Sequence, residues 1–249
     1  MKTEWDYTKL ADAYLKRPDY AASAIDALVA ISKMSKTSKV CDVGAGVGHL
    51  TLMLANYKPT IIAVEPNDAM RANGMKRSMH CEDVSWVEGT GENTLQPDAY
   101  FDLVTFGSSF NVCDRDKALQ ESKRILKPGG WFACMWNHRD LDDQIQSTVE
   151  NIIKQNVPNY GYGSRREDQL GILEASNLFE VVLKLQSRVI HGVGLNDYVE
   201  AWRSHATLER QAGKNFEHVI DEISKYLTTV DDTLIQVPYT TSVWIAKLG

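Results

Sequence analysis

The residues best suited to bind a ligand surround a short glycine-rich turn. The turn alternates glycine with small apolar residues: Gly44, Ala45, Gly46, Val47 and Gly48. Because glycine has no Cβ, such a turn lets the backbone approach a ligand closely. Acidic residues stand on both sides of it, with Asp42 two residues before the first glycine and Glu65 about 20 residues further on. This arrangement predicts a small-molecule binding site.

The spacing indicates which ligand binds there. A dinucleotide-binding fingerprint reads G-x-G-x-x-G, whereas this turn reads G-x-G-x-G. The carboxylate of Asp42 would repel a pyrophosphate and attract an ammonium group. Glu65 occupies the offset at which an acidic side chain hydrogen-bonds ribose hydroxyls. A ligand with both an amine and a ribose matches S-adenosylmethionine.

The turn has to be held between a strand and a helix. Residues 40–43 form a short apolar run, which is typical of a buried parallel strand. Residues 49–56 return to helical spacing with their apolar side chains on one face. Strand, turn and helix in this order build the first crossover of a doubly wound sheet. The start of the helix also supplies unpaired N–H groups that favour an anionic group.

Two stretches resemble the signatures of a known family. Residues 40–54 resemble motif I of the class I S-adenosylmethionine-dependent methyltransferases. Residues 101–130, which end in Leu126-Lys127-Pro128-Gly129-Gly130, closely resemble the second signature of that family. The resemblance covers roughly residues 10–136 and points to the small-molecule, methyltransferase type 11-like branch. It implies an α/β fold, a doubly wound, seven-stranded Rossmann-like sheet with strand 7 antiparallel and a helical cap insertion.

We expect one methyltransferase domain over residues 1–249. Its parts are an N-terminal helical lid (1–35), a cofactor-binding core (36–136), cap helices with strand 6 (137–230) and strand 7 (231–249). The predicted strands are residues 40–43, 60–65, 84–88, 101–106, 131–136, 179–191 and 233–248. The predicted helices include residues 6–17, 20–34, 114–126, 141–156 and 164–176, with two more between 196 and 226.

The resemblance assigns the residues that hold S-adenosylmethionine. Tyr14 and Arg17 resemble residues that close over its methionine end, where Arg17 could pair with the carboxylate; a packing tyrosine and a solvated arginine are the alternatives. Thr90 stands where many members carry an acid, so its hydroxyl or a backbone N–H must serve the adenine. The predicted cofactor-binding set is Tyr14, Arg17, Asp42, Gly44, Ala45, Gly46, Gly48, Glu65, Pro66, Asn67, Met70, Thr90, Gly91, Glu92, Phe106 and Gly107.

Methyl transfer depends mainly on holding the acceptor in line and excluding water, so a general base can be absent. His138 follows the fifth predicted strand and is the candidate base, although it could simply be a loop histidine. Asn111 stands where many small-molecule members place a histidine, and it would position the acceptor or cap the next segment. Cys113 lacks the Pro-Cys context of a nucleophile. No dedicated ligand spacing surrounds His138, so we predict no metal.

Composition and charge narrow the partners. The chain has 249 residues and a formal net charge of −6, a balance that argues against DNA or RNA as the substrate. The sequence has no apolar stretch of about 18 residues and no signal-peptide core at its start. Its four cysteines form no C-x-x-C pair, which fits a reducing compartment. We expect a cytoplasmic protein without membrane or nucleic-acid partners, and the oligomeric state stays open.

The leading hypothesis is transfer of a methyl group from S-adenosylmethionine to oxygen or nitrogen of a small-molecule acceptor, with S-adenosylhomocysteine as product. The sequence after residues 101–106 lacks the Asp/Asn-Pro-Pro-aromatic pattern of enzymes that methylate exocyclic amines of bases, or glutamine. One alternative is a methyltransferase for proteins or nucleic acids. Another is a protein that binds the cofactor without turnover. An NAD-dependent oxidoreductase is disfavoured by Asp42 and by the glycine spacing.

Overall fold

A seven-stranded sheet forms the centre of the part of the chain that the computed structural model describes, residues 7–230 and 233–249. The strands lie in the order β3-β2-β1-β4-β5-β7-β6. The first five are parallel, while β7 pairs antiparallel with both β5 and β6. This order confirms the predicted doubly wound sheet with strand 7 antiparallel. The strands are β1 (Lys39–Val43), β2 (Thr60–Val64), β3 (Val84–Val87), β4 (Phe101–Gly107), β5 (Leu126–Arg139), β6 (Phe179–Gly194) and β7 (Leu234–Leu248).

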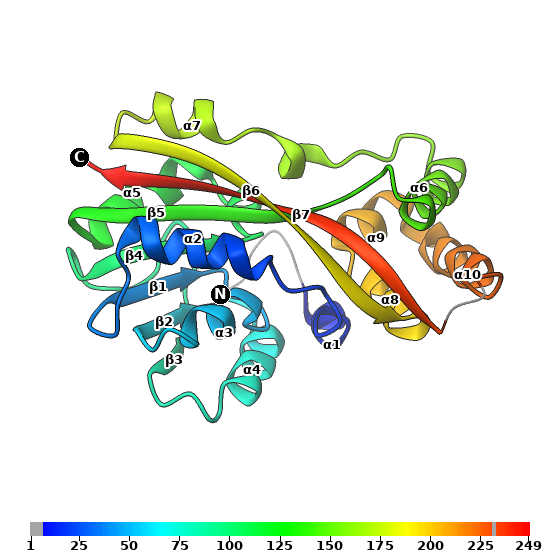
Figure 1. Cartoon of the computed structure of the whole chain (residues 1–249), viewed down its shortest axis with the longest axis horizontal. Coiled ribbons are helices and arrows are strands. Elements are labelled where there is room, and N and C mark those ends of the chain that lie inside the picture. Colours follow the sequence, from blue (N-terminus) through cyan, green and yellow to red (C-terminus); the bar gives the residue numbers. More distant parts are fainter. Residues whose placement is uncertain (1–6, 231–232) are drawn as a thin grey trace.

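Helices cover both faces of this sheet (Figure 1). On one face, α2 (Ala22–Ser32) and α3 (His49–Ala55) share an apolar cluster with the sheet that includes Leu28. On the other, α5 (Arg115–Ile125) packs through residues such as Ile125. Coverage on both sides explains why the parallel strands read as short apolar runs.

The cap helices gather at one end of the molecule, around the long arms of β6 and β7 (Figure 1). With 16 and 15 residues, these strands extend beyond the short parallel strands. Their arms share a separate apolar cluster with the helices, in which Val219, Ile220 and Ile235 are buried. This confirms a helical cap insertion. The cap helices are α6 (Gln144–Asn156), α8 (Leu195–Arg203), α9 (Ala206–Ala212) and α10 (Phe216–Leu227).

The stretch predicted as one cap helix over residues 164–176 is not a single helix, and its second half packs away from the cap. It forms a 3-10 turn (Gly163–Arg166) and the short α7 (Leu170–Ala175). Leu173 of α7 is buried in the cluster that covers the main sheet, and α7 contacts β6. The apolar face of α7 therefore packs on the sheet and not on the cap helices.

Residues 196–226 form three helices where the sequence predicts two. The break between α8 and α9 lies at Ser204 and His205. The 3-10 turn Gly213–Asn215 then separates α9 from α10, and Gly213 has a φ of +53°, which glycine adopts readily. Another 3-10 turn, Phe110–Val112, follows β4.

The N-terminal segment lies between the sheet and the cap (Figure 1). It forms a 3-10 turn (Thr8–Leu10) and a short α1 (Ala11–Tyr14) in place of the helix predicted over residues 6–17. The first residue of that prediction, like residues 231 and 232 of predicted strand 7, lies outside the described residues. α1 contacts both α4 (Asp68–Arg77) and α8, so it joins the core to the cap. No helix of the described chain is long and apolar enough to cross a membrane.

Candidate active site

A cavity of about 520 Å³ opens beside the carboxyl ends of β1 and β4. The strand order reverses at this point, which is where doubly wound sheets bind their ligands. Its lining comes from the glycine turn, the loops after β2, β3 and β4, the end of β5, the N-terminal segment and the cap. The core therefore builds one end of the cavity, and the cap builds the other.

The glycine turn presents its backbone to the cavity. Gly44, Gly46 and Gly48 have φ values of +64°, +58° and +86°, which other residues rarely adopt. A Cβ on Gly44 would lie 2.5 Å from the Cβ of Ser109. A Cβ on Gly46 would meet no atom of the described residues within 4 Å. Gly46 therefore faces open space, as a turn that holds a ligand must.

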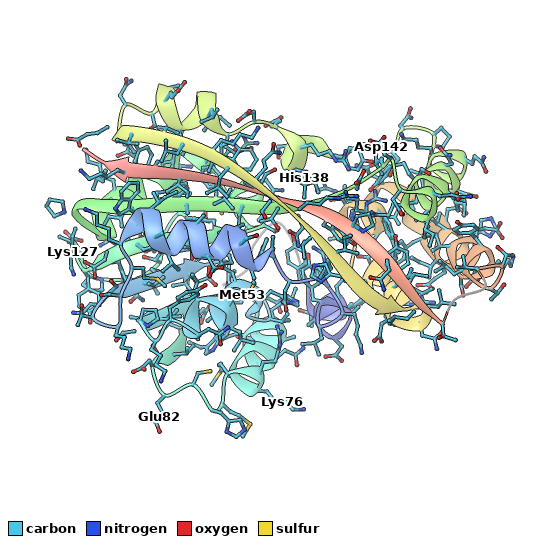
Figure 2. The ribbon with its side chains drawn as sticks, viewed as in Figure 1. Met53, Lys76, Glu82, Lys127, His138 and Asp142 are labelled. Carbon is cyan, nitrogen blue, oxygen red and sulfur yellow. The ribbon has the colours of Figure 1, made fainter. Side chains whose placement is uncertain are left out.

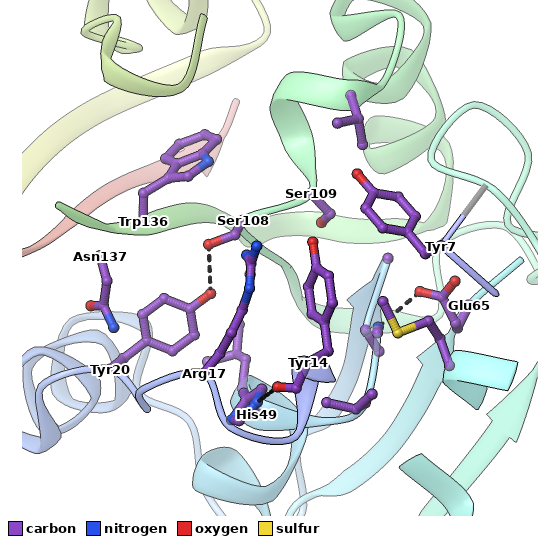
Figure 3. A pocket seen from close by; sticks show the side chains of 18 of the residues that line it. Tyr7, Tyr14, Arg17, Tyr20, His49, Glu65, Ser108, Ser109, Trp136 and Asn137 are labelled. Atoms are coloured by element: carbon purple, nitrogen blue, oxygen red, sulfur yellow. Dashed lines mark hydrogen bonds between the residues drawn. The ribbon is translucent and has the colours of Figure 1, made fainter. Parts of the chain in front are cut away.

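Glu65 connects the glycine turn to the next loop. Its Oε2 accepts a hydrogen bond from Gly46 N, and its Oε1 accepts one from Asn67 N, both at 2.8 Å (Figure 3). Burial raises the pKa of Glu65, and these two N–H donors oppose that shift. Because a carboxylate oxygen can accept more than one hydrogen bond, Glu65 can shape the turn and still accept from ribose hydroxyls.

Asp42 is fully buried at the end of β1 and is among the residues that line the cavity. Its Oδ2 accepts from Thr51 Oγ1 at 2.6 Å, and its Oδ1 accepts from Thr105 Oγ1 at 2.8 Å. Burial raises the pKa of Asp42 to about 6, although both hydroxyls oppose the shift. A cation bound nearby would favour the ionised carboxylate.

The cofactor-binding residues predicted after β2 and β3 line one wall of the cavity. Asn67 begins α4 by accepting a hydrogen bond from Met70 N at 3.0 Å, which fixes the start of that helix. A Cβ on Gly91 would lie 2.4 Å from Cys113 Sγ, so this turn also needs a glycine. The lining residues from these two loops are Pro66, Asn67, Met70, Thr90, Gly91 and Glu92.

Tyr14 and Arg17 both line the cavity from the N-terminal segment, with their side chains next to each other (Figure 3). Arg17 donates from Nε to Ser204 Oγ at 2.8 Å and from Nη2 to Ser204 O at 2.9 Å. Its guanidinium lies 3.9 Å from the centre of the Tyr14 ring. His49 Nε2 lies 2.9 Å from Tyr14 O, and its Nδ1 lies 2.6 Å from Asp19 Oδ1. Arg17 therefore joins the N-terminal segment to the cap, and His49 joins it to the core.

Three predicted site residues are not among those that line the cavity. Phe106 is fully buried in the main core, although the adjacent Gly107 does line the cavity. Gly48 faces away, toward Trp86, which a Cβ would meet at 3.2 Å. Asn111 accepts a hydrogen bond from Trp136 Nε1 at 3.0 Å. Since Trp136 does line the cavity, Asn111 acts on the site by orienting that ring.

The candidate base reaches the cavity from the end of β5. Figure 2 shows His138 and Lys127 at opposite ends of this strand. His138 and the preceding Asn137 both line the cavity. Asn137 is fixed by a donor and an acceptor contact, because its Nδ2 donates to Asp19 O at 2.8 Å and its Oδ1 accepts from Thr241 Oγ1 at 2.6 Å. The end of β5 that carries His138 is therefore held against the N-terminal segment.

Sequence reasoning missed a polar pair in the middle of the cavity. Tyr20 OH and Ser108 Oγ lie 3.0 Å apart (Figure 3), and burial raises the pKa of Tyr20. Ser108 has a φ of +62°, a strained conformation that is concentrated at functional sites. The position of Ser108 directly after β4, at the point of strand reversal, was the available signal. No spacing in the sequence connects it to Tyr20.

Metal and thiol chemistry find no support in the described residues. They contain no group of three or more His, Cys, Asp or Glu side chains arranged to hold a metal ion. Cys113 lines the cavity, but burial raises the pKa of its thiol to about 12. The thiolate that a nucleophile requires is therefore disfavoured at neutral pH.

Comparisons with known proteins agree with this geometry. Residues 41–134 match the family described as "Methyltransferase domain". The uncharacterized methyltransferase YcgJ of Bacillus subtilis is 22% identical over 227 residues, which are 89% of this chain and 88% of that protein. Its crystal structure has a TM-score of 0.57 at 18% identity and covers 92% of this chain and 99% of that one. Residues 41–134 of this chain thus carry a methyltransferase domain, and its sheet has the class I methyltransferase topology. The protein is thus an enzyme.

Other relatives match over part of their length. The ubiquinone/menaquinone biosynthesis C-methyltransferase UbiE of Vibrio campbellii is 34% identical over 136 residues, 49% of this chain and 50% of that protein. A structure of phosphoethanolamine N-methyltransferase 2 from Haemonchus contortus, with phosphomonomethylethanolamine and S-adenosylhomocysteine, has a TM-score of 0.52 at 16% identity. It covers 91% of this chain and 52% of that one. The chain thus spans about half of each of these two relatives, and its acceptor has to be argued from its own cavity.

Proposed function

We propose that this methyltransferase transfers the methyl group of S-adenosylmethionine to oxygen or nitrogen of a small molecule. The observation that carries the proposal is one continuous cavity that holds both ends of the reaction. Gly46 and Glu65 line one end, while Trp136 and His138 line the other. Its volume of about 520 Å³ lies within the usual range of roughly 300–1,000 Å³ for small-ligand sites.

The core end fits the parts of the cofactor. Gly46 offers open backbone, Glu65 offers carboxylate oxygens for the ribose, and Asp42 offers a negative charge for the amino group. When bound, S-adenosylmethionine supplies a methyl group on a positively charged sulfur. The residues of this chain have to orient it toward the acceptor and exclude water. Tyr14 and Arg17 lie where they can close that end.

Enclosure favours a small acceptor over a macromolecule. The N-terminal segment and the cap both contribute to the lining, and Arg17 and Ser204 connect them. A protein or nucleic-acid acceptor would be served better by an open and basic surface, whereas this chain carries a net charge of −6. The relative UbiE is named as a C-methyltransferase, so a test must detect transfer to any kind of atom.

His138 is the proposed base for an acceptor that must lose a proton. It lines the cavity at the end of β5, beside Trp136. An imidazole is well suited to this role near neutral pH. Asn111 acts indirectly, because its side-chain oxygen accepts a hydrogen bond from the Trp136 indole and so orients that ring.

Formation of S-adenosylhomocysteine tests the proposal for every kind of acceptor atom. The protein is incubated with S-adenosylmethionine and sets of phenols, amines and carboxylates, and the product is quantified by mass spectrometry. We expect turnover with small molecules, and a His138→Asn variant with lower kcat but unchanged S-adenosylhomocysteine affinity. Tight cofactor binding without turnover would favour a binding protein. Turnover only on protein or RNA would favour the macromolecular alternative.

A further inference from the structure

The cap end of the cavity carries charged and aromatic side chains that methyl transfer itself does not require. They come from the end of β5, the loop before α7, helix α8 and strand β7. We call them the cap cluster: Arg139, Tyr162, Arg166, Tyr198, Trp202 and Tyr239. Arginine beside aromatic rings is a common way to recognise a flat molecule that carries negative charge.

Arg139 is a buried guanidinium with unused hydrogen-bond donors. Its side chain is 9% exposed, and Nη2 donates to Glu150 Oε2 at 2.7 Å. Nη1 has no hydrogen-bond partner among the described residues and is screened from water. The single negative charge of Glu150 does not fully neutralise the positive charge of Arg139. Glu150 also accepts a hydrogen bond from Tyr162 OH and pairs with Lys154 Nζ at 3.2 Å. A buried donor without a partner is costly unless a ligand supplies the acceptor.

Tyr198 presents a second unused donor. Tyr198 is 3% exposed, and its hydroxyl has no acceptor among the described residues. The indole of the neighbouring Trp202 is only a donor. Burial raises the pKa of Tyr198, so the hydroxyl keeps its proton and can donate it.

The rings and charges around these donors favour a negatively charged ligand. The Arg139 guanidinium lies 4.4 Å from the centre of the Trp202 ring, and the Arg166 guanidinium lies 4.0 Å from that of Tyr162. Arg139, Arg166 and Lys154 bring three positive charges to this region. Glu150 pairs with Arg139 and Lys154, and Asp143 is a second carboxylate close enough to act on Tyr198. The rings offer flat apolar surface for the body of the same ligand.

We propose that the cap cluster binds an oxyanion of the methyl acceptor, a carboxylate or a phosphate, through Arg139 Nη1 and the Tyr198 hydroxyl. The inference rests on the proposed function, since it names the chemistry of that function's acceptor. An acceptor held there by its anionic group extends along the cavity toward His138 and the core end. Neutral analogues of the same shape would leave both donors without partners and bind more weakly.

Two variants test the two donors separately. Tyr198→Phe removes a hydroxyl that donates to no described residue, so this substitution should not lower stability. Its matched control is Tyr226→Phe, which lies in the same apolar cluster but does not line the cavity. Arg139→Met is made together with Glu150→Gln so that no carboxylate is left buried alone, and Glu150→Gln by itself is the control. Calorimetry with saturating S-adenosylhomocysteine measures binding of 3,4-dihydroxybenzoate, phenyl phosphate and 3,4-dihydroxybenzamide.

We expect one of the two anions to bind the wild-type protein at least about tenfold more tightly than the amide. The anion that binds tells a carboxylate site from a phosphate site. Tyr198→Phe and the Arg139 double variant should each weaken that anion by about tenfold or more, with control variants within about twofold. Equal binding of anion and amide would overturn the proposal. Wild-type affinity for the anion in both test variants would also overturn it. So would the absence of anion binding at an anion concentration of about 10 mM, at which a ligand with a Kd of about 1 mM would nearly saturate the site.

The same titrations keep this inference separate from the proposed function. S-adenosylhomocysteine should bind the wild-type protein and all variants alike, because the substituted residues lie at the cap end. Failure of the wild-type protein to bind S-adenosylhomocysteine would contradict the proposed function. Normal cofactor binding without preference for the anion would contradict only the oxyanion site.

Discussion

Replacing Gly46 with alanine should separate cofactor binding from folding. The backbone at Gly46 has a φ of +58°, so alanine costs about 1–2 kcal/mol in the left-handed region. No steric cost is added, because the new Cβ would meet no described atom within 4 Å. For a chain of 249 residues, we expect the Tm to fall by roughly 2–8 °C.

The same methyl group should obstruct the ligand, because it points into the space offered to the cofactor. We expect the Kd of S-adenosylhomocysteine to rise at least about tenfold, which corresponds to roughly 1.4 kcal/mol, and Gly46→Val to lose binding. Calorimetry measures the affinity, and thermal unfolding with and without ligand measures stability. Gly163→Ala is the matched control, since Gly163 has a φ of +55°, no described atom within 4 Å of its Cβ position and no place in the cavity lining.

Gly44→Ala should give the opposite pattern to Gly46→Ala. Its Cβ would lie 2.5 Å from the Cβ of Ser109, so the substitution should damage folding first. If Gly46→Ala retained the wild-type affinity and the wild-type ligand-induced shift in Tm, the glycine turn would not be the cofactor cradle.

Three further predictions concern the charged residues of the core end. Glu65→Ala should weaken S-adenosylhomocysteine binding by about 1.5–3 kcal/mol, the scale of a hydrogen bond to a charged group; unchanged calorimetric affinity in a folded variant would remove the ribose assignment. Since the pKa of Asp42 is about 6, protonation removes its negative charge as pH falls from 7 to 5, and the Kd of the cationic S-adenosylmethionine should rise. Asp42→Asn should flatten this pH dependence of the Kd. An equally steep dependence in that variant would exclude Asp42 as its source. Residues 7–20 should gain protection from hydrogen exchange when S-adenosylhomocysteine binds, and Arg17→Lys should lose much of that gain; equal protection with and without ligand would make this segment a fixed part of the core.

The core end of the site was predictable because its signals are local. Asp42, the glycine turn and Glu65 belong to one continuous unit of strand β1, turn, helix α3 and strand β2, where spacing along the chain fixes spacing in the fold. The helix predicted over residues 114–126 forms as α5, and the Asp114 side chain caps its start by accepting from Lys117 N. The hairpin of β6 and β7 could be expected from the family resemblance and its alternating pattern.

The cap end was not predictable because its contacts join distant segments. Arg17 meets Ser204 across 187 residues, and Tyr20 meets Ser108 across 88. No periodicity relates such pairs, so the sequence indicates helices there but not which side chains converge. The short α7 was misplaced for the same reason, since an apolar helix face does not reveal whether it will pack on the sheet or on other helices.

Calorimetric titration with S-adenosylhomocysteine and, separately, with NADH tests the central claim most directly. The geometry of Asp42, the glycine turn and Glu65 predicts saturable binding of one S-adenosylhomocysteine per chain, weakened in Gly46→Ala and preserved in Gly163→Ala. NADH should not bind, because its pyrophosphate would face the charge of Asp42. Binding of NADH in preference to S-adenosylhomocysteine, or S-adenosylhomocysteine binding that is indifferent to Gly46→Ala, would contradict the assignment of this cavity.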